Sequence, residues 1–414
     1  MVQPAATGVK KTAVSALVAA ETVSVLGTRM TYLALPWFVL VTTGSPGKMS
    51  VVLAVEIVPQ AVLGIPSGSL VQRFGARTTM LACDFARAPL LAAIPLLYAA
   101  GVLSFGLLLA LVALVGCFMP PYFASQRVIL PELVGEDERR MSQANSLIEG
   151  GTALAAVLGP ALAGVLIPFV GAPNVLYVDA ATYVVSFLLI LTFVPRRKPV
   201  APVTEAESGV LAGLRFLVHD RLLAPIAVVV VGFGFLTAGL SAGLPVYAYD
   251  EFDGSSRIAG FFFAAVGAGA VVGSILAVAA VRKVSPLRLS GLAVVCFALP
   301  VWVMPFLPPA PVVSTALFVS NMFVVLANGP AIAVVTARTP ENLRAKVMTA
   351  VIAASSVSVP LGFLVAGQIL ERWGLVPLFS IVAVGLTGMA LVYASIAFRH
   401  RELEPAPAGV PARA

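Results

Sequence analysis

The chain has 414 residues, of which 59% are hydrophobic and only 11% are charged, and its mean hydropathy is +1.00. Soluble proteins carry about 25% charged residues, so this composition excludes a set of water-soluble domains and indicates a chain that lies mostly in lipid. The three cysteines lie in apolar segments and the two histidines lie far apart, which excludes a disulfide scaffold and a zinc site. We expect no metal and no cofactor.

Twelve apolar segments are long enough to cross the roughly 30 Å hydrocarbon layer of a bilayer. The first follows Lys10 and Lys11 and is too long for the core of a signal peptide, so we interpret it as a membrane span. The predicted spans are residues 14–41, 50–71, 78–99, 103–125, 143–170, 174–194, 223–249, 257–281, 287–307, 312–337, 347–370 and 375–398.

The basic residues indicate the orientation. With the N-terminus in the cytoplasm, 21 of the 26 Lys and Arg residues fall in cytoplasmic segments and only three fall in outer loops. Cytoplasmic loops carry such an excess, so we expect a multi-pass protein of the inner (cytoplasmic) membrane with both termini inside. Attraction to the anionic inner leaflet explains the net charge of +7, and we expect no nucleic-acid partner.

The chain divides into two similar halves. A polar, proline-containing stretch follows the sixth span and continues as "GVLAGLRFLVHDRLL", which has the spacing of an amphipathic helix on the membrane surface. The segments after spans 4 and 10 resemble each other, with Gly164 and Gly367 offset by 203 residues. We therefore predict an all-α membrane protein of twelve transmembrane helices in two pseudo-symmetric six-helix bundles, which is the organisation of a rocker-type secondary transporter. The predicted parts are an N-terminal bundle (1–195), a cytoplasmic linker (196–222), a C-terminal bundle (223–398) and a cytoplasmic tail (399–414).

The loop between spans 2 and 3 carries a signature of the form Gly-x-x-x-Asp-Arg-x-Gly-Arg-Arg. The matching residues are Gly68, Arg73, Gly75 and Arg77, while Gln72 stands in place of Asp and Ala76 in place of Arg. By this loop the chain resembles the major facilitator superfamily. The segments "LPELVGEDERRMSQANSL" and "LGPALAGVL" are similar to its drug–proton antiporter branch, which includes macrolide and enterobactin exporters. The resemblance covers essentially the whole chain and implies export of an amphipathic small molecule in exchange for protons.

In relatives the acidic residue of this loop pairs with an arginine and locks one conformation. Gln72 cannot form that ion pair, so either the lock is weaker here or another acid, such as Asp84, replaces it. Asp84 and Arg87 are spaced i, i+3 and can meet on one helix face, where we interpret them as an anchor of the preceding loop. The alternative is that the whole loop is a tight turn with cytoplasmic positive charges.

Gly159, Pro160 and Gly164 resemble the antiporter signature Gly-Pro-x-x-Gly-Gly, with Ala163 in place of one glycine. Pro160 removes a backbone hydrogen bond, and small residues let a neighbouring helix approach closely. The motif is therefore either a hinge or a site of ordinary close packing.

Seven ionisable residues fall inside the predicted spans, all of them in the N-terminal half. They are Glu21, Arg29, Glu56, Asp84, Arg87, Glu149 and Asp179. A charged side chain at mid-helix costs about 2.5–3.5 kcal/mol on insertion scales, so each one needs a partner or a function. If side chains carry protons, we expect the N-terminal half to do so.

Arg29 and Glu56 are predicted at the same depth, about 22 Å and about 21 Å from the inner surface at 1.5 Å of rise per residue. We interpret them as a proton-coupling pair, because opening a dry site that contains an acid and an arginine changes the balance between the charged and neutral acid. The alternative is a static ion pair between spans 1 and 2. Glu21 is either a further coupling residue or an anchor at an interface.

We interpret the remaining acids as structural. Glu149 lies near the inner surface, where Arg127 or Arg140 can pair with it. Asp179 lies near the outer end of span 6 and is interpreted as a helix-start residue.

The resemblance implies that spans 1, 4, 7 and 10 line a substrate cavity. Its candidate residues are Tyr32, Tyr122, Gln126, Phe235, Asn321 and Asn328. Aromatic side chains suit a bulky, mostly apolar ligand. The alternative is that many of these side chains face lipid or other helices.

No nucleotide-binding loop and no nucleophile–base set is found, so we expect neither ATP-driven transport nor an enzyme. The sequence predicts a monomeric secondary transporter that binds a small molecule and protons and exports hydrophobic or amphipathic compounds, such as an antibiotic or a secondary metabolite, by alternating access. Two alternatives are a proton-coupled symporter that imports a nutrient and a transporter-like sensor that moves no protons.

Overall fold

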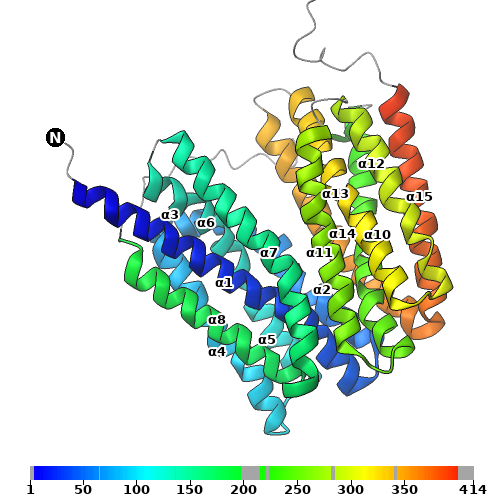
Figure 1. Cartoon of the computed structure of the whole chain (residues 1–414), viewed down its shortest axis with the longest axis horizontal. Coiled ribbons are helices and arrows are strands. Elements are labelled where there is room, and N and C mark those ends of the chain that lie inside the picture. The colour runs from blue at the N-terminus through cyan, green and yellow to red at the C-terminus, as the bar shows by residue number, and fades with distance from the viewer. Residues whose placement is uncertain are drawn as a thin grey trace, which may run out of the picture. The chain divides into compact units, whose positions relative to one another are not determined.

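Long helices make up most of the described chain, as the computed structural model shows (Figure 1). The structure describes residues 4–64, 66–135, 137–196, 215, 217–220, 223–280, 285–339 and 343–399, and no strand occurs among them. Most of the predicted linker and the predicted tail from residue 400 onwards lie outside the described residues.

The first half contains eight helices among its described residues. They are α1 (Pro4–Thr43), α2 (Pro46–Leu63), α3 (Ser67–Phe74), α4 (Ala76–Ala99), α5 (Phe105–Cys117), α6 (Met119–Val134), α7 (Glu138–Val170) and α8 (Ala172–Phe193). The second half contains α10 (Leu223–Glu251), α11 (Ser256–Ala280), α12 (Pro286–Val301), a 3-10 turn (Met304–Phe306), α13 (Ala310–Arg338), α14 (Arg344–Trp373) and α15 (Leu375–Arg399).

Twelve helical segments of the described chain are long and apolar enough to cross a membrane, which confirms the predicted fold class. The fourth span extends furthest beyond its predicted end, since it runs over Phe105–Val134 instead of residues 103–125. It consists of α5 and α6 with an interruption at Phe118, just before the consecutive prolines Pro120 and Pro121, which lack backbone donors. Leu130 and Leu133 of this extension are buried against other helices of the unit.

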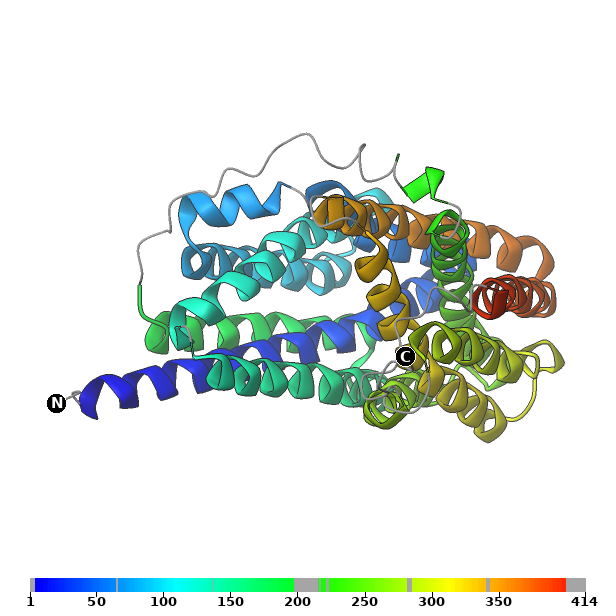
Figure 2. The same cartoon turned by 90° about the horizontal axis from the view of Figure 1, so that it is seen from above.

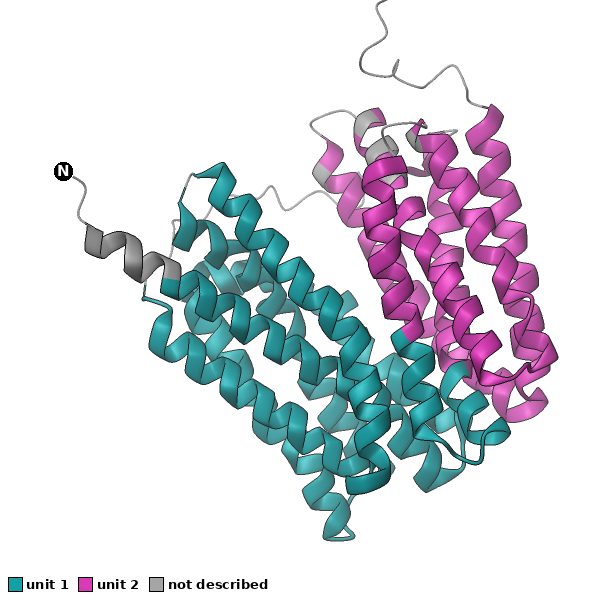
Figure 3. Ribbon diagram, in the orientation of Figure 1, with its two compact units in different colours: residues 1–205, 244–264 teal, residues 206–243, 265–414 magenta. Residues whose placement is uncertain are grey.

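The helices form two compact units (Figure 3). Unit 1 comprises Met1–Glu205 together with Leu244–Ala264, and unit 2 comprises Ala206–Gly243 together with Ala265–Ala414. The end of α10 and the start of α11 therefore belong to unit 1, whereas the predicted boundaries assign them to the C-terminal bundle. Those boundaries stay a prediction.

Within unit 1, α1 lies along α7 and α8, and α4 packs against α8 (Figure 2). An apolar cluster fills one end of this packing and includes Leu17 of α1, Met80 of α4, Ile129 of α6 and Ile190 of α8. Burial of this surface stabilises the helix contacts, so the polar side chains further along the same helices are held in fixed positions.

Within unit 2, close backbone contacts join the helices. A Cβ atom at Gly269 or Gly273 of α11 would overlap a carbonyl of α13, at Phe318 and Met322 respectively. Small residues of this kind let transmembrane helices approach closely, so the glycines of this part of α11 serve packing.

Candidate functional site

A buried arginine lies among the helices of unit 1. Arg87 of α4 is only 1% exposed, and its guanidinium lies 4.5 Å from the ring centroid of Tyr122 and 4.2 Å from that of Tyr183. Its Nη2 atom pairs with the carboxylate of Asp84, one turn earlier, at 2.5 Å. Charge pairing and two aromatic faces therefore compensate the burial of this cation. The contact that the i, i+3 spacing predicts is present.

Asp84 is fully buried by the same group of side chains. Its second carboxylate oxygen accepts a hydrogen bond from Ser186 of α8 at 2.7 Å, and the Ser186 hydroxyl lies 3.4 Å from that of Tyr122. Among the described residues, no ion pair joins this carboxylate to Arg73 or Arg77. Its contacts tie α4 to α8, and a role in anchoring the loop stays a prediction.

Two residues of the loop signature, Gly75 and Arg77, hold the start of α4 in place. Gly75 has a φ of 81°, a conformation that glycine adopts readily, and it joins α3 to α4. Arg77 then donates to the carbonyl oxygens of Val194 at 2.6 Å and Leu191 at 2.8 Å. Carbonyls at a helix C-terminus lack partners within the helix, so Arg77 fastens the start of α4 to the end of α8.

The remaining signature residues lie on α3. Arg73 is exposed, with its guanidinium 5.4 Å from the ring of Phe74, and Gly68 has open space around it. Gln72 is half-buried. A role for these residues in locking a conformation stays a prediction.

Glu21 of α1 is 2% exposed and binds Gln126 of α6. The Gln126 Nε2 atom donates to Glu21 Oε2 at 2.7 Å, whereas Glu21 Oε1 is buried without a hydrogen-bond partner. This contact occupies the Gln126 side chain, which the sequence assigns to the substrate cavity.

Glu56 of α2 is half-buried, and its Oε2 atom is buried without a hydrogen-bond partner. The predicted ion pair with Arg29 is absent, since no nitrogen of Arg29 lies within 4 Å of the Glu56 carboxylate in this described part of the chain. The reason is the direction of the arginine. The Cβ of Arg29 faces Gly159 of α7, so its side chain leaves α1 on the α7 side. The two charges still interact at longer range.

The Gly159–Gly164 motif packs against two helices. A Cβ atom at Gly159 would lie 2.5 Å from the Cβ of Arg29 on α1, and one at Gly164 would lie 3.0 Å from the Cα of Gly260 on α11. Ser256 of α11 also donates to the Gly164 carbonyl at 3.1 Å. Pro160 lies inside a continuous α7. Close packing is therefore present, while a hinge role stays a prediction.

The two aromatic cavity candidates of unit 1 have different surroundings. Tyr32 is half-buried and meets Phe263 edge to face, with ring centroids 5.8 Å apart. Tyr122 is 3% exposed and packs on Arg87, so in this structure it belongs to the buried polar group.

The candidates of unit 2 lie on α10 and α13. Phe235 is half-buried, with its carbonyl against Gly362 of α14. Asn321 is half-buried and donates to the carbonyl of Leu317 at 2.9 Å, whereas Asn328 is exposed. Their part in a substrate cavity stays a prediction.

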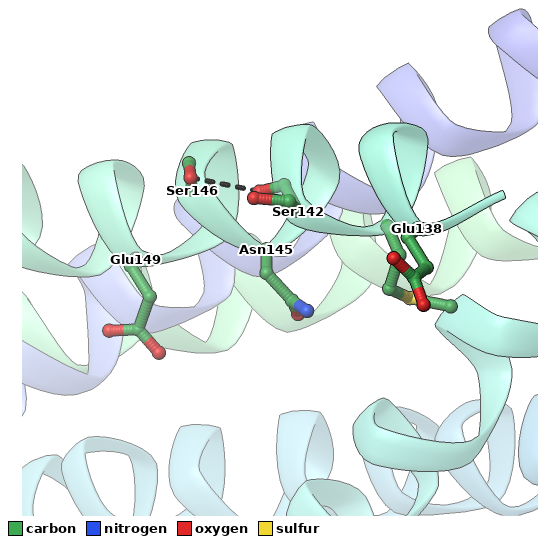
Figure 4. Close-up of a pocket in the computed structure, with 6 residues that line it drawn as sticks. Glu138, Ser142, Asn145, Ser146 and Glu149 are labelled. Carbon is green, nitrogen blue, oxygen red and sulfur yellow. Dashed lines mark hydrogen bonds between the residues drawn. The ribbon is translucent and has the colours of Figure 1, made fainter.

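A shallow depression of about 530 Å³ lies over one face of the first half of α7 (Figure 4). It is lined by Glu138, Met141, Ser142, Asn145, Ser146 and Glu149. Glu149 is exposed, and Arg140 pairs instead with Asp137 at 3.1 Å. A face this polar is unsuited to hydrocarbon, so we expect it to meet water.

A second hollow of about 500 Å³ lies among the ends of α1, α4, α7 and α8. Trp37, Phe38 and Tyr98 supply its aromatic surface, Asn174 and Thr42 supply polar groups, and no charged side chain lines it.

Asp179 is the site residue that sequence reasoning placed wrongly. It does not start a helix, because α8 begins seven residues earlier at Ala172, and its side chain is fully buried. The Thr31 hydroxyl of α1 donates to its carboxylate. The sequence does contain a sign of this buried position. The spacing of Asp179, Tyr183 and Ser186 places three polar side chains along one side of a mostly apolar helix.

Within the described part of the chain, no group of three His, Cys, Asp or Glu side chains is arranged to hold a metal ion.

Comparison with known proteins gives consistent matches over most of the chain. Residues 17–363 match the sequence profile of the Major Facilitator Superfamily. The multidrug efflux pump Tap of Mycobacterium tuberculosis (strain ATCC 25618 / H37Rv) is 27% identical over 393 residues, which cover 92% of each protein. The pump of the same name from Mycolicibacterium fortuitum is 26% identical over 393 residues, covering 91% of this chain and 94% of the pump.

Two solved structures share the fold. The nucleoside transporter NupG matches 94% of this chain and 100% of its own with a TM-score of 0.73 at 16% identity. A bacterial homologue of the human lysosomal transporter Spinster matches 99% of this chain and 100% of its own with a TM-score of 0.72 at 14% identity.

Proposed function

The chain belongs to the Major Facilitator Superfamily of membrane transporters, and from this premise we propose that it exports hydrophobic or amphipathic small molecules in exchange for protons. Support for export comes from relatives that bear the name multidrug efflux pump and match nine-tenths of the chain. The proposal includes a monomer in the inner membrane with both termini in the cytoplasm, as the distribution of basic residues indicates.

Proton coupling is supported by one observation on the carboxylates of unit 1. Glu21 and Glu56 each have a buried oxygen without a hydrogen-bond partner. By contrast, Asp84 uses both of its oxygens in contacts with Arg87 and Ser186. Acids inside membrane bundles that lack a contacting counter-ion are typical of proton relays. We therefore assign proton binding to Glu56 and Glu21, with Arg29 acting on Glu56 at longer range.

A polar entry surface is consistent with this function. The depression combines carboxylates with Ser and Asn side chains on the first half of α7, whereas the second half of the helix is apolar. Such a surface can solvate the polar part of an amphipathic compound.

The test is a proton-flux assay in liposomes that contain the full chain and an internal pH dye. Lipophilic antibiotics and dyes are added one at a time. We expect a pH change triggered by a compound in the wild type, its loss in Glu56→Gln with downhill substrate exchange retained, and no effect of Glu251→Gln, an exposed acid of the same type at the end of α10.

Three other results would contradict the proposal in different ways. An unchanged proton flux in Glu56→Gln refutes the assignment of that residue. Inward movement of substrate together with protons indicates a symporter. Binding of a compound without any flux indicates a sensor.

A further inference from the structure

Asp179 occupies a dry and tightly closed place in unit 1. The side chain is 0% exposed. The backbone of α1 covers it at Gly27, where a Cβ atom would overlap both the Asp179 carboxylate and the Thr182 hydroxyl. Water therefore has no space at this point, and the protein alone must satisfy the carboxyl group.

The hydroxyl groups around Asp179 provide one hydrogen bond that is not already used elsewhere. Thr31 donates to Oδ2 and has no other acceptor among its hydrogen bonds. Thr182 has a single hydroxyl hydrogen, and its shorter contact is to the Asp179 backbone carbonyl at 2.7 Å, with Oδ1 further away at 3.1 Å. Each hydroxyl donates only once, so Oδ1 of a carboxylate has no full donor here.

Tyr183 lies close enough to act on the Asp179 carboxylate, but the partner within hydrogen-bond distance of its hydroxyl is Thr28. Thr28 donates to the carbonyl of Ser24 at 3.0 Å, so its hydroxyl oxygen accepts from the Tyr183 hydroxyl, which lies 3.0 Å away. Protonation of Asp179 removes the need for another donor. Its own O–H donates to the Thr182 hydroxyl, while Thr182 donates to the backbone carbonyl of Asp179. Every donor and acceptor then has a partner.

The charges around Asp179 also favour its protonated form. On α4, packed against α8, Arg87 is the one buried cation near this site in the described chain; it attracts Asp179, but its contacting partner is Asp84. From α2, Glu56 repels Asp179, while Arg29 and Tyr32 of α1 act on that same Glu56.

From α7, the charged side chains lie at the far end of the helix, between Glu138 and Glu149. An ionised Asp179 would therefore place a negative charge in a dry bundle without a cation in contact with it, which is costly.

We infer that Asp179 is a further proton-binding residue of the transporter, beside Glu56 and Glu21, and that it holds a proton while α1 is closed over it. The inference rests on the proposed proton-coupled export for its place in the transport cycle. Release of the proton to water requires α1 to separate from α8, since Gly27 and Thr31 close the site. Asp179 on α8 then shares proton coupling with Glu56 on α2 and Glu21 on α1.

The experiment uses the full chain and two independent measurements. Infrared difference spectra of the reconstituted protein, recorded as the pH is raised, report the C=O band of protonated carboxyl groups. We expect Asp179→Asn to remove one component of this band, and Asp137→Asn, at an exposed helix cap, to leave the band unchanged. In the liposome assay, Asp179→Asn is expected to lose proton flux and retain downhill substrate exchange, which also demonstrates a folded protein.

The outcomes separate the inference from the function on which it rests. An unchanged infrared band in Asp179→Asn overturns proton binding at Asp179, whatever the transport result. A lost band with wild-type proton flux overturns its role in coupling. If the wild type itself moves no protons with any compound, the proposed function and the coupling role both fail, while the band still decides whether Asp179 binds a proton. Asp179→Glu, which keeps the acid, is expected to retain a carboxyl band and part of the flux.

Discussion

Removal of the buried Arg87 tests how unit 1 tolerates charge in its interior. In Arg87→Met the Asp84 carboxylate, 0% exposed, keeps only its hydrogen bond from Ser186. Removing one partner of a buried ion pair costs about 3–5 kcal/mol. The two tyrosine rings on the guanidinium, each worth about 0.5–2 kcal/mol, place the expected loss towards the upper end of that range.

The double variant Asp84→Leu/Arg87→Met decides whether the pair explains this loss. Removing both charges leaves neither one buried alone, so we expect most of the stability to return. Denaturant unfolding of the purified protein in detergent measures the free energy of unfolding. The matched control is Arg140→Met, which breaks an i, i+3 Asp–Arg pair that is 54% and 46% exposed and is worth less than about 1 kcal/mol. A double variant as unstable as the sum of the single variants would refute the reasoning.

Two further predictions concern packing and the helix ends. Gly164→Ala places a Cβ atom against the backbone of Gly260 and should lower the melting temperature of the purified protein. Gly150→Ala, which places its Cβ atom in open space, should leave the melting temperature unchanged. Equal melting temperatures of the two variants would contradict this prediction. Arg77→Met removes two charged hydrogen bonds to carbonyls at the end of α8 and should cost about 1–3 kcal/mol in the same unfolding assay. Arg73→Met should have little effect, because Arg73 is exposed, and a similar loss in both variants would show that the carbonyl contacts are unimportant.

The fold class follows from local properties of the sequence. A span requires about 20 apolar residues in a row, and this requirement is visible without knowing what packs against the segment. All twelve predicted spans are therefore present as helices. The i, i+3 contact of Asp84 with Arg87 is local in the same sense, because the geometry of one helix determines it.

The partners of the other charges depend on contacts between helices. Equal depth is the basis for pairing Arg29 with Glu56, but depth does not define the direction in which a side chain leaves its helix. The contact of Arg29 with Gly159 turns it towards α7. In the same way, the close approach of α1 to α8 at Gly27 converts Asp179 from a predicted helix-start residue into a buried acid.

The sequence alone thus predicts how many times the chain crosses the bilayer and which segments do so, since lipid selects for apolar length along the chain. The tertiary structure decides which polar side chains meet, because helix rotation and packing distance depend on small residues at contacts between segments far apart in sequence. Glu21 with Gln126, and Asp179 with Thr31, are joined across 105 and 148 positions of the chain. No periodicity within a single helix contains that information.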